Sequence, residues 1–408
     1  MSTDKTQTKQ GQGPLTGLRV LDIATIIAGP LAGSLLGDFG AEVLKVELPG
    51  RGDAIRALRP HKDGVSLWSK VVNRGKHGIT LDLRQPEGAD ILKRLVKEHD
   101  VLIENFRPGT LEKWGLGPDV LWAINPRLTI LRVSAFGRKG PYAEKPGFAR
   151  VADAMSGFLN LCGPEDGAPI HPGYPIADSI TGLFGAYGLL AALFELKNNP
   201  NAPGQVVSVS LFESMFRILD FLAVEYDQLG EVRHRYGNRN PYAAPGNVFK
   251  SRDGKWITLA ASAQSIFERL CHAIDKPELI DDPKYKDNVE RLKHSDDLDT
   301  IIAAWFLERD ADDACRHMES HDVSAVRVRT IDELFEEEQV HANDMLVSVD
   351  DPELGPLRMQ GVTPGFSRTP GAVSRAGNAL GDANDTVYRE RLGFSLDEIA
   401  ALKDKGVI

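Results

Sequence analysis

The side chain with the clearest chemical potential in this sequence is Asp178. It follows a segment that contains glycine and proline, residues 173–177, and precedes an apolar run, residues 179–194, in which small and aliphatic side chains recur at helical spacing. This pattern places a carboxylate at a helix N-terminus, where backbone N–H groups and the helix dipole favour its ionised form. An ionised, oriented carboxylate can act as a nucleophile. Aspartate is also among the preferred N-cap residues, so a purely structural role is the alternative.

A second set of candidates is basic and lies in loops that adjoin predicted strands. The set consists of Arg74, Lys76, Arg84, Arg107, Lys113, Arg138 and Lys139. The chain has 48 basic and 58 acidic side chains, so an anionic ligand must be met by a local basic cluster rather than by the overall field. Because Arg and Lys bind phosphate through charge-assisted hydrogen bonds, these loops predict a phosphorylated ligand. The alternative is that each residue is a solvated loop charge.

Composition limits the function classes. A chain of 408 residues is long enough for two to three domains, and its net charge of −10 argues against nucleic acid and anionic membranes as partners. Three widely spaced cysteines, Cys162, Cys271 and Cys315, suit a reducing compartment, so we expect a cytoplasmic protein. Residues 1–14 are polar and predict a flexible tail without a targeting signal.

Two other patterns are interpreted as structural. The apolar run 179–194 is shorter than the roughly 20 residues of a membrane span and contains three glycines, so we expect a buried helix and no membrane contact. His317 and His321 lie one helical turn apart near Cys315, but no fourth ligand is close in sequence, so no metal site is expected.

The elements that must position these residues alternate between strand and helix periods. Strands are predicted at 18–23, 42–47, 78–83, 101–104 and 128–134, and helices at 30–39 and 85–99. This alternation is typical of an α/β domain with a mostly parallel, Rossmann-like sheet, whose ligands gather in the loops after the strands.

The pattern changes near residue 228. A hairpin is predicted around 251–254, followed by amphipathic helices at about 264–274, 296–308 and 310–320. We therefore predict a smaller α+β domain, residues 228–340, inserted into a large domain formed by residues 15–227 and 341–408. Near the C-terminus, Ser395 and Glu398 predict a capping box.

Seven segments resemble one known family in order and spacing. They are Ala28-Gly29-Pro30, residues 37–47, residues 81–84, residues 104–109, residues 125–128, Ala177-Asp178 and Gly204-Gln205. In these segments the chain resembles the class III CoA-transferases, which include formyl-CoA and carnitine CoA-transferases. The resemblance implies a two-domain subunit, an interlocked homodimer, and an acyl-CoA and small carboxylic acids as substrates. Coenzyme A then enters as a substrate thioester, and no cofactor is expected.

The resemblance also assigns roles to individual residues. Asp178 matches the family's nucleophile, and Ala28 matches a residue beside the thioester. Ile27 stands where some relatives have a polar residue, so a polar contact to the acyl group is not expected there. The positions that match the family's CoA site are Leu81, Arg84, Asn105, Phe106, Arg107 and Lys113, to which the basic loop adds Arg138 and Lys139.

The expected reaction moves CoA from an acyl-CoA to a carboxylic acid through a mixed anhydride and an aspartyl-CoA thioester. Residues 147–153 resemble the dicarboxylate-using branch, and Arg150, His171 and Arg239 are candidates to hold a distal carboxylate. A short dicarboxylate such as succinate, mesaconate, itaconate or malate is therefore expected. Two alternatives remain: a 2-methylacyl-CoA racemase, which needs two acid/base groups at the α-carbon, and a CoA-binding dimer without catalysis.

Overall fold

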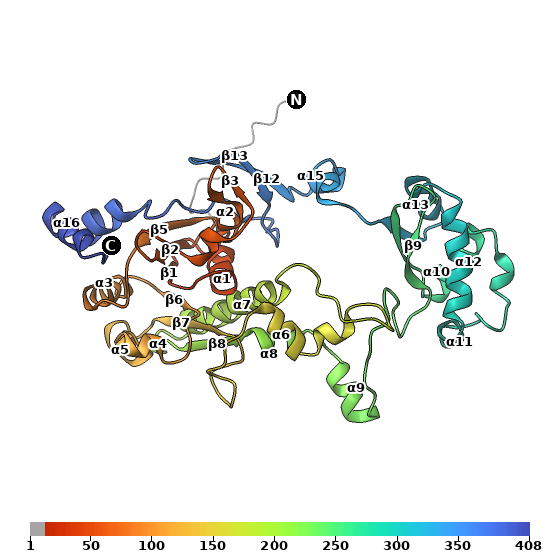
Figure 1. Ribbon diagram of the computed structural model, residues 1–408, viewed down its shortest axis with the longest axis horizontal. Coiled ribbons are helices and arrows are strands. Elements are labelled where there is room, and N and C mark those ends of the chain that lie inside the picture. Colours follow the sequence, from red (N-terminus) through yellow and green to blue (C-terminus); the bar gives the residue numbers. More distant parts are fainter. Residues whose placement is uncertain (1–12) are drawn as a thin grey trace. The chain divides into compact units, whose positions relative to one another are not determined.

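The computed structural model describes residues 13–408, so most of the predicted N-terminal tail lies outside the described residues (Figure 1). The chain forms two compact units. The first contains the chain up to Phe158, Pro172–Ala223 and Gln339–Ile408, and the second contains Leu159–His171 and Val224–Glu338. The segment Leu159–His171, which the sequence placed in the large domain, thus clusters with the smaller unit.

The first unit is built on a six-stranded sheet in the order β5-β2-β1-β6-β7-β8, with all neighbouring strands parallel. The strands are β1 Arg19–Asp22, β2 Glu42–Glu47, β5 Lys76–Thr80, β6 Val101–Glu104, β7 Thr129–Ser134 and β8 Val206–Ser210. When the six strands are numbered 1 to 6 in chain order, their order in the sheet is 3-2-1-4-5-6, as in Rossmann-like folds. This confirms the predicted fold class. The strand order reverses between β1 and β6, so the loops after these two strands meet at the switch point.

Helices cover both faces of this sheet. The helices of the first unit are α1 Ala28–Gly37, α2 Leu67–Val72, α3 Pro86–Val96, α4 Thr110–Lys113, α5 Pro118–Ile124, α6 Ala149–Met155, α7 Ile176–Asn198, α8 Leu211–Arg217 and α16 Leu396–Asp404, together with a short turn at Ala54–Ala57 and a π-helix at Thr386–Arg391. The short turn Phe158–Leu161 contains a unit boundary. One core packs the sheet against α3, α4, α5 and α16, and the other packs it against α1, α6, α7 and α8.

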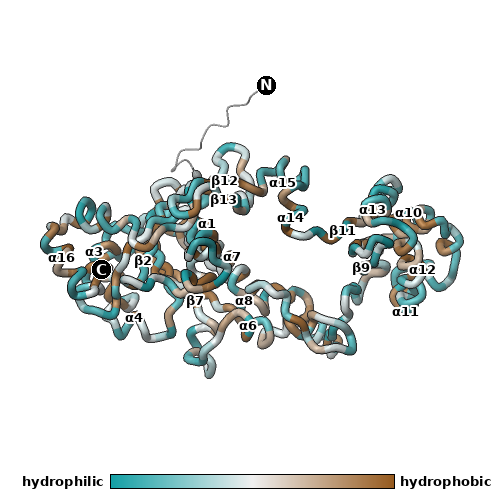
Figure 2. Tube along the Cα trace, turned by 45° about the horizontal axis from the view of Figure 1, so that its top comes forward, coloured by the Kyte–Doolittle hydropathy of each residue, from teal (hydrophilic) through white to brown (hydrophobic). Residues whose placement is uncertain are grey.

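Alternation of side chains along each strand produces these two cores. Val20 points into the core beneath α1 and α7, whereas Leu21 points into the core beneath α3 and α16, and both are fully buried. Strands buried on both faces are mostly apolar. In Figure 2 the apolar residues of the chain are brown and the polar ones teal.

The C-terminal segment covers the free edge of the sheet at β5. The Asp382 and Asn384 side chains accept hydrogen bonds from the N–H groups of Gly78 (2.7 Å) and Thr80 (2.9 Å), and the Tyr388 hydroxyl donates to the Thr80 carbonyl at 2.5 Å. Side chains here replace the backbone ladder of a further strand, so an edge that would otherwise be open is satisfied.

The second unit is an α+β assembly around a three-stranded antiparallel sheet, β11-β10-β9. Its elements are β9 Gly246–Lys250, β10 Trp256–Ala260, β11 Ser324–Arg327, α10 Gln264–Ala273, α11 Asn288–Lys293, α12 Ser295–Leu307, α13 Ala311–Ser320, α14 Ile331–Leu334 and a short turn at Pro277–Leu279. Phe249, Phe267 and Phe306 lie in its separate hydrophobic core. The helices α9 Leu222–Leu229 and α15 Glu338–Ala342 contain the unit boundaries.

Several elements differ from the sequence predictions. The strand β8 and two hairpins, β3 His61–Lys62 with β4 Val65–Ser66 and β12 Leu346–Asp351 with β13 Gly355–Gln360, were not predicted. The capping box of Ser395 and Glu398 is confirmed.

The length argument for the apolar run was wrong, because α7 extends from Ile176 to Asn198 and is long and apolar enough to cross a membrane by length and composition. One such helix is weak evidence for a span, since the core helices of soluble proteins pass the same test. Here the glycines of α7 pack against α1 and β7. The absence of membrane contact therefore stays a prediction.

Candidate active site

The loop after β1 is held rigidly at the carboxyl edge of the sheet. Ile26 has a positive φ of 69°, which is strained for a β-branched residue. Its N–H donates to both carboxylate oxygens of Asp53, at 3.0 and 3.1 Å, and the N–H of Thr25 donates to the Asn105 Oδ1 at 2.8 Å. The loops after β1 and β6 are thereby joined at the switch point, where Rossmann-like folds bind ligands.

A buried charge network lies behind this loop. Lys45 is fully buried, with its Nζ 3.1 Å from an oxygen of Asp53 and 3.7 Å from Asp22, and it donates to the Ala24 carbonyl. Lys76 is also fully buried and donates to Asp22 at 2.7 Å and to the Pro30 carbonyl at 2.6 Å. Burial lowers the pKa of Lys76 to about 8, against the opposing effect of Asp22. The network fixes both ends of the segment that leads into α1.

The N-terminus of α1 contacts α7 through a glycine. A Cβ built on Gly182 would lie 3.0 Å from the Ala28 carbonyl oxygen, so the two helices approach as closely as glycine allows. Within the described residues, the N–H groups of Ala28 and Gly29 have no hydrogen-bond acceptor, and α1 has no side-chain cap. Two backbone donors at this helix N-terminus are therefore available to a ligand with a partial negative charge.

Asp178 lies in the first turn of α7, one turn before Gly182. The residue at the N-cap is Pro175, and the helix has no side-chain cap, so the alternative that Asp178 is an N-cap residue is wrong. Asp178 is half-buried. Its pKa is raised to about 7, chiefly by burial and further by the charge of Asp153. The expectation that the helix N-terminus keeps this carboxylate firmly ionised is therefore also wrong, because these two effects dominate.

The sequence-predicted CoA-site residues fall at the same edge of the sheet, in the loops after β5, β6 and β7. Arg107, Lys113 and Lys139 are exposed there. The Arg84 side chain is 60% exposed and its guanidinium binds Asp82, at 2.7 Å. Arg138 is half-buried, with Glu104 at 3.4 Å and burial lowering its pKa, so part of its charge is already neutralised.

The remaining predicted residues pack in the core or form hydrogen bonds between loops. Ile27, Ala28 and Leu81 are buried, and the Leu81 side chain belongs to the core beneath α3. Phe106 packs edge-on to Trp114 with ring centroids 5.1 Å apart. Asn105 is occupied by its hydrogen bonds to Thr25. Contacts of Ile27 and Leu81 with a ligand would have to use their backbone.

Sequence reasoning missed Ile26, Asp53 and Asp153. A positive φ at a β-branched residue has no sequence signal, and Asp53 lies in a loop far from β1 in sequence. Asp153 does have a signal, because it is an acid within the otherwise apolar end of α6, Val151 to Met155.

Of the three candidates for a distal carboxylate, Arg239 is occupied. It forms ion pairs with Asp296 at 2.6 Å and Asp299 at 2.8 Å inside the second unit. Arg150 is exposed at the start of α6, and His171 is half-buried. Arg150 is therefore the candidate of the first unit that keeps an accessible charge.

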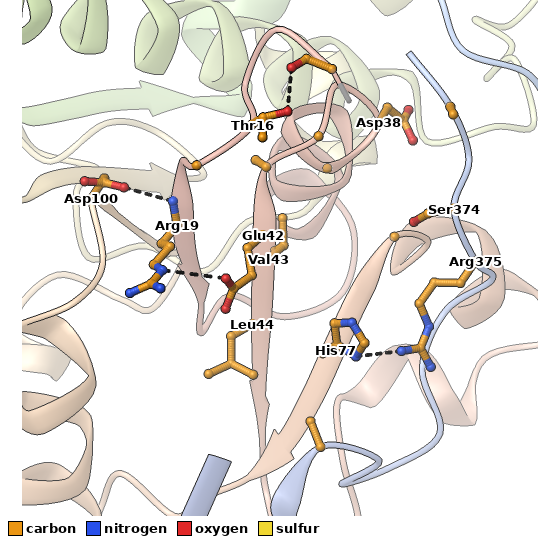
Figure 3. Close-up of a pocket in the computed structure, with 18 of the residues that line it drawn as sticks. Thr16, Arg19, Asp38, Glu42, Val43, Leu44, His77, Asp100, Ser374 and Arg375 are labelled. Atoms are coloured by element: carbon orange, nitrogen blue, oxygen red, sulfur yellow. Dashed lines mark hydrogen bonds and ion pairs between the residues drawn. The ribbon is translucent and has the colours of Figure 1, made fainter. Parts of the chain in front are cut away.

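A large cavity of about 1030 Å³ lies elsewhere, at the amino ends of β1, β2 and β5 (Figure 3). Its charged side chains are paired: Arg19 with Glu42 at 3.6 Å, and Arg375 with Asp382 at 2.6 Å. His77 receives a hydrogen bond from Arg375 at 2.7 Å. This cavity is at the edge of the sheet opposite to the loop of Ile26, so it is distinct from the site around Asp178. Among residues 13–408, no group of three or more His, Cys, Asp or Glu side chains could hold a metal ion.

Comparison with known proteins agrees with this geometry. Residues 15–384 match CoA-transferase family III. The chain is 42% identical to a succinyl-CoA–D-citramalate CoA-transferase of Chloroflexus aurantiacus over 97% of this chain and 98% of that protein. It is 32% identical to the human succinyl-CoA:glutarate CoA-transferase over 97% of this chain and 90% of that protein. The fold resembles the crystal structure of a CaiB/BaiF family protein from Brucella suis, with a TM-score of 0.82, 32% identity and coverage of 93% of this chain and 99% of the other.

The chain belongs to CoA-transferase family III. The predicted enzyme class, a class III CoA-transferase, is confirmed.

Proposed function

We propose that this enzyme transfers CoA from a succinyl-CoA type donor to a short dicarboxylic acid, with Asp178 as the nucleophile. The observation that carries the proposal is the place of Asp178: a half-buried carboxylate in the first turn of α7, one turn from the contact between Gly182 and the N-terminus of α1. The dicarboxylate preference is supported by relatives that are named for citramalate, malate and glutarate.

Each step of the proposed reaction exchanges one acyl bond for another. A carboxylate oxygen of Asp178 attacks the thioester carbonyl carbon, the C–S bond breaks, and CoA leaves as a thiolate. The thiolate then attacks the Asp178 carbonyl of the mixed anhydride, which releases the donor acid and leaves an aspartyl-CoA thioester. The acceptor carboxylate reverses both steps. The protein must exclude water and hold the reacting groups in line.

Backbone donors support this chemistry. The free N–H groups of Ala28 and Gly29 suit the oxyanion that forms on the thioester carbonyl. The exposed cations Arg84, Arg107, Lys113 and Lys139 suit the phosphates of CoA. Arg150, which is exposed at the start of α6, suits the distal carboxylate of the acid.

We also propose a dimer of this chain. Leu183, Tyr187, Leu190 and Phe194 recur along one side of α7 and are 52%, 72%, 42% and 67% exposed. An apolar stripe of this length on a helix is typical of an interface. The occupant that the family resemblance favours is a second copy.

The test is a transfer assay with the substitution Asp178→Asn. Purified enzyme is supplied with succinyl-CoA and a panel of mono- and dicarboxylic acids, and new acyl-CoA is separated chromatographically. We expect dicarboxylates to be preferred and Asp178→Asn to lose transfer, since an amide cannot form the anhydride. Hydroxylamine added during turnover should mark the peptide of Asp178 in the wild type. Normal turnover by Asp178→Asn without a mark on the wild type would reject the nucleophile.

A further inference from the structure

Asp153 is a buried acid close to the proposed nucleophile. It is 1% exposed and lies on α6, which packs against α7 and α8. Its charge acts on Asp178, in the first turn of the neighbouring helix.

The helix interface around Asp153 carries further buried polar groups. Thr181 on α7 and Ser214 on α8 are 0% and 2% exposed, and within the described residues neither hydroxyl has a hydrogen-bond partner. Thr181 follows Asp178 by three residues, so both lie on the same side of α7. Buried hydroxyls without partners are rare in apolar cores. The contact of α6, α7 and α8 is therefore a polar region next to Asp178 rather than a purely apolar one.

The other charged side chains on the elements that contact α7 are hydrogen-bonded, ion-paired or exposed. α1 and β8 contribute no charged side chain. On β7, Arg132 binds Glu104 and Glu112, and on α8, Glu213 binds Ser210 while Arg217 is exposed. On α6, Arg150 is exposed. Among the charged residues of these elements, Asp153 is the one whose charge acts on Asp178.

We propose that Asp153 is a positioning residue whose negative charge favours the acylated states of Asp178 over its free carboxylate. The proposal rests on Asp178 being the nucleophile. Repulsion between two carboxylates exists only while both are ionised. When an oxygen of Asp178 bonds to the acyl carbon, the electron pair of the C–S bond leaves with the CoA sulfur, and Asp178 becomes a neutral anhydride. The repulsion is then relieved, and the same holds for the aspartyl-CoA thioester.

This role has two measurable consequences. The first is a raised pKa of Asp178, which makes it a more basic nucleophile and places the acid limb of kcat/KM near pH 7. The second is a larger fraction of enzyme held as the covalent adduct at equilibrium. A purely structural role of Asp153 predicts neither.

The test compares Asp153→Asn and Asp153→Ser with the control Asp90→Asn, which removes an exposed charge of the same unit whose partner is Lys93. For each folded protein, kcat/KM with succinyl-CoA is measured from pH 5.5 to 9. Hydroxylamine trapping at Asp178 is quantified at pH 8 by peptide mass. We expect both Asp153 variants to move the acid limb down by about one pH unit, since burial, the larger cause, remains. The trapped fraction should fall roughly threefold or more, because the repulsion no longer favours the adduct.

The control should match the wild type in both measurements. A folded Asp153→Asn or Asp153→Ser whose acid limb and trapped fraction coincide with those of the wild type would overturn the proposal. The serine variant serves where the asparagine variant does not fold. A wild type that yields no adduct at Asp178 would instead reject the nucleophile assignment, so the two failures are distinguishable.

Discussion

Gly182 of α7 lies directly against the Ala28 carbonyl of α1, with no room for a side chain between them. This contact places the first turn of α7, which carries Asp178, beside the free backbone N–H groups of α1. The distance between the proposed nucleophile and the proposed oxyanion donors is therefore set by the absence of a Cβ atom.

Gly182→Val should damage both stability and activity. Its side chain would meet the Ala28 carbonyl and Leu31, both within 3.1 Å of the Cβ position. Overpacking of this kind costs about 1–3 kcal/mol, and a displaced α1 should lower kcat/KM by about 100-fold. Thermal melts and the transfer assay check both effects. The matched control is Gly365→Val, because Gly365 has nothing within 4 Å of a Cβ position. Equal behaviour of the two variants would contradict the role of the Gly182 contact.

Exposed cations at the carboxyl edge should govern affinity for acyl-CoA. Arg107→Ala and Lys113→Ala are each expected to raise KM for the CoA thioester about 5- to 10-fold with little change in kcat, and to weaken its dependence on salt. Steady-state kinetics at two ionic strengths provide the measurement. Lys97→Ala is the control, since Lys97 is equally exposed but follows α3 at the opposite edge of the sheet. If Lys97→Ala raised KM as much as the other two variants, the overall charge of the protein rather than a local CoA-binding site would explain the effect.

His99 should make the protein acid-sensitive. It is 1% exposed, and burial lowers its pKa from 6.5 to about 4. Between these values the unfolded chain binds a proton that the folded protein does not, so stability is lost as the pH falls through this window. The loss at pH 4.5 relative to pH 7 should reach about 2 kcal/mol.

His99→Asn should remove this loss, because asparagine can donate to the Leu95 carbonyl, which lies 2.6 Å from the His99 Nδ1, but does not titrate. Urea unfolding at the two pH values measures the effect. His272→Asn, at an exposed position, serves as the control. An unchanged pH dependence in His99→Asn would refute the assignment.

The apolar stripe of α7 should hold two copies together. Tyr187→Asp places a charge on a side chain that is 72% exposed in the single chain, so it should shift the protein towards monomer at micromolar concentration. Light scattering coupled to size exclusion gives the mass. Leu396→Asp, 65% exposed on α16, should leave the mass unchanged. A wild type that is monomeric would contradict the interface itself.

Most of the sheet could be predicted from the sequence because its strands are buried on both faces and are therefore mostly apolar. The strand β8 and the hairpin of β12 and β13 were missed since their burial is only partial. For the site, segment similarity pointed to Asp178, and the basic residues beside predicted strands pointed to the carboxyl edge; both assignments stay predictions. Neither signal was sufficient for the effect of Asp153, because that effect depends on how α6 packs against α7, which no local pattern encodes.

The coverage of β5 by the C-terminal segment has a consequence for synthesis of the chain. The hydrogen bonds from the Gly78 N–H to Asp382 and from the Thr80 N–H to Asn384 each join residues 304 positions apart. While the ribosome makes the intervening chain, the N–H groups of this strand have no partner, and an exposed strand edge can recruit another chain. Completion of the sheet is therefore post-translational. Truncation before Asp382 should yield a protein that aggregates rather than one that is merely less active.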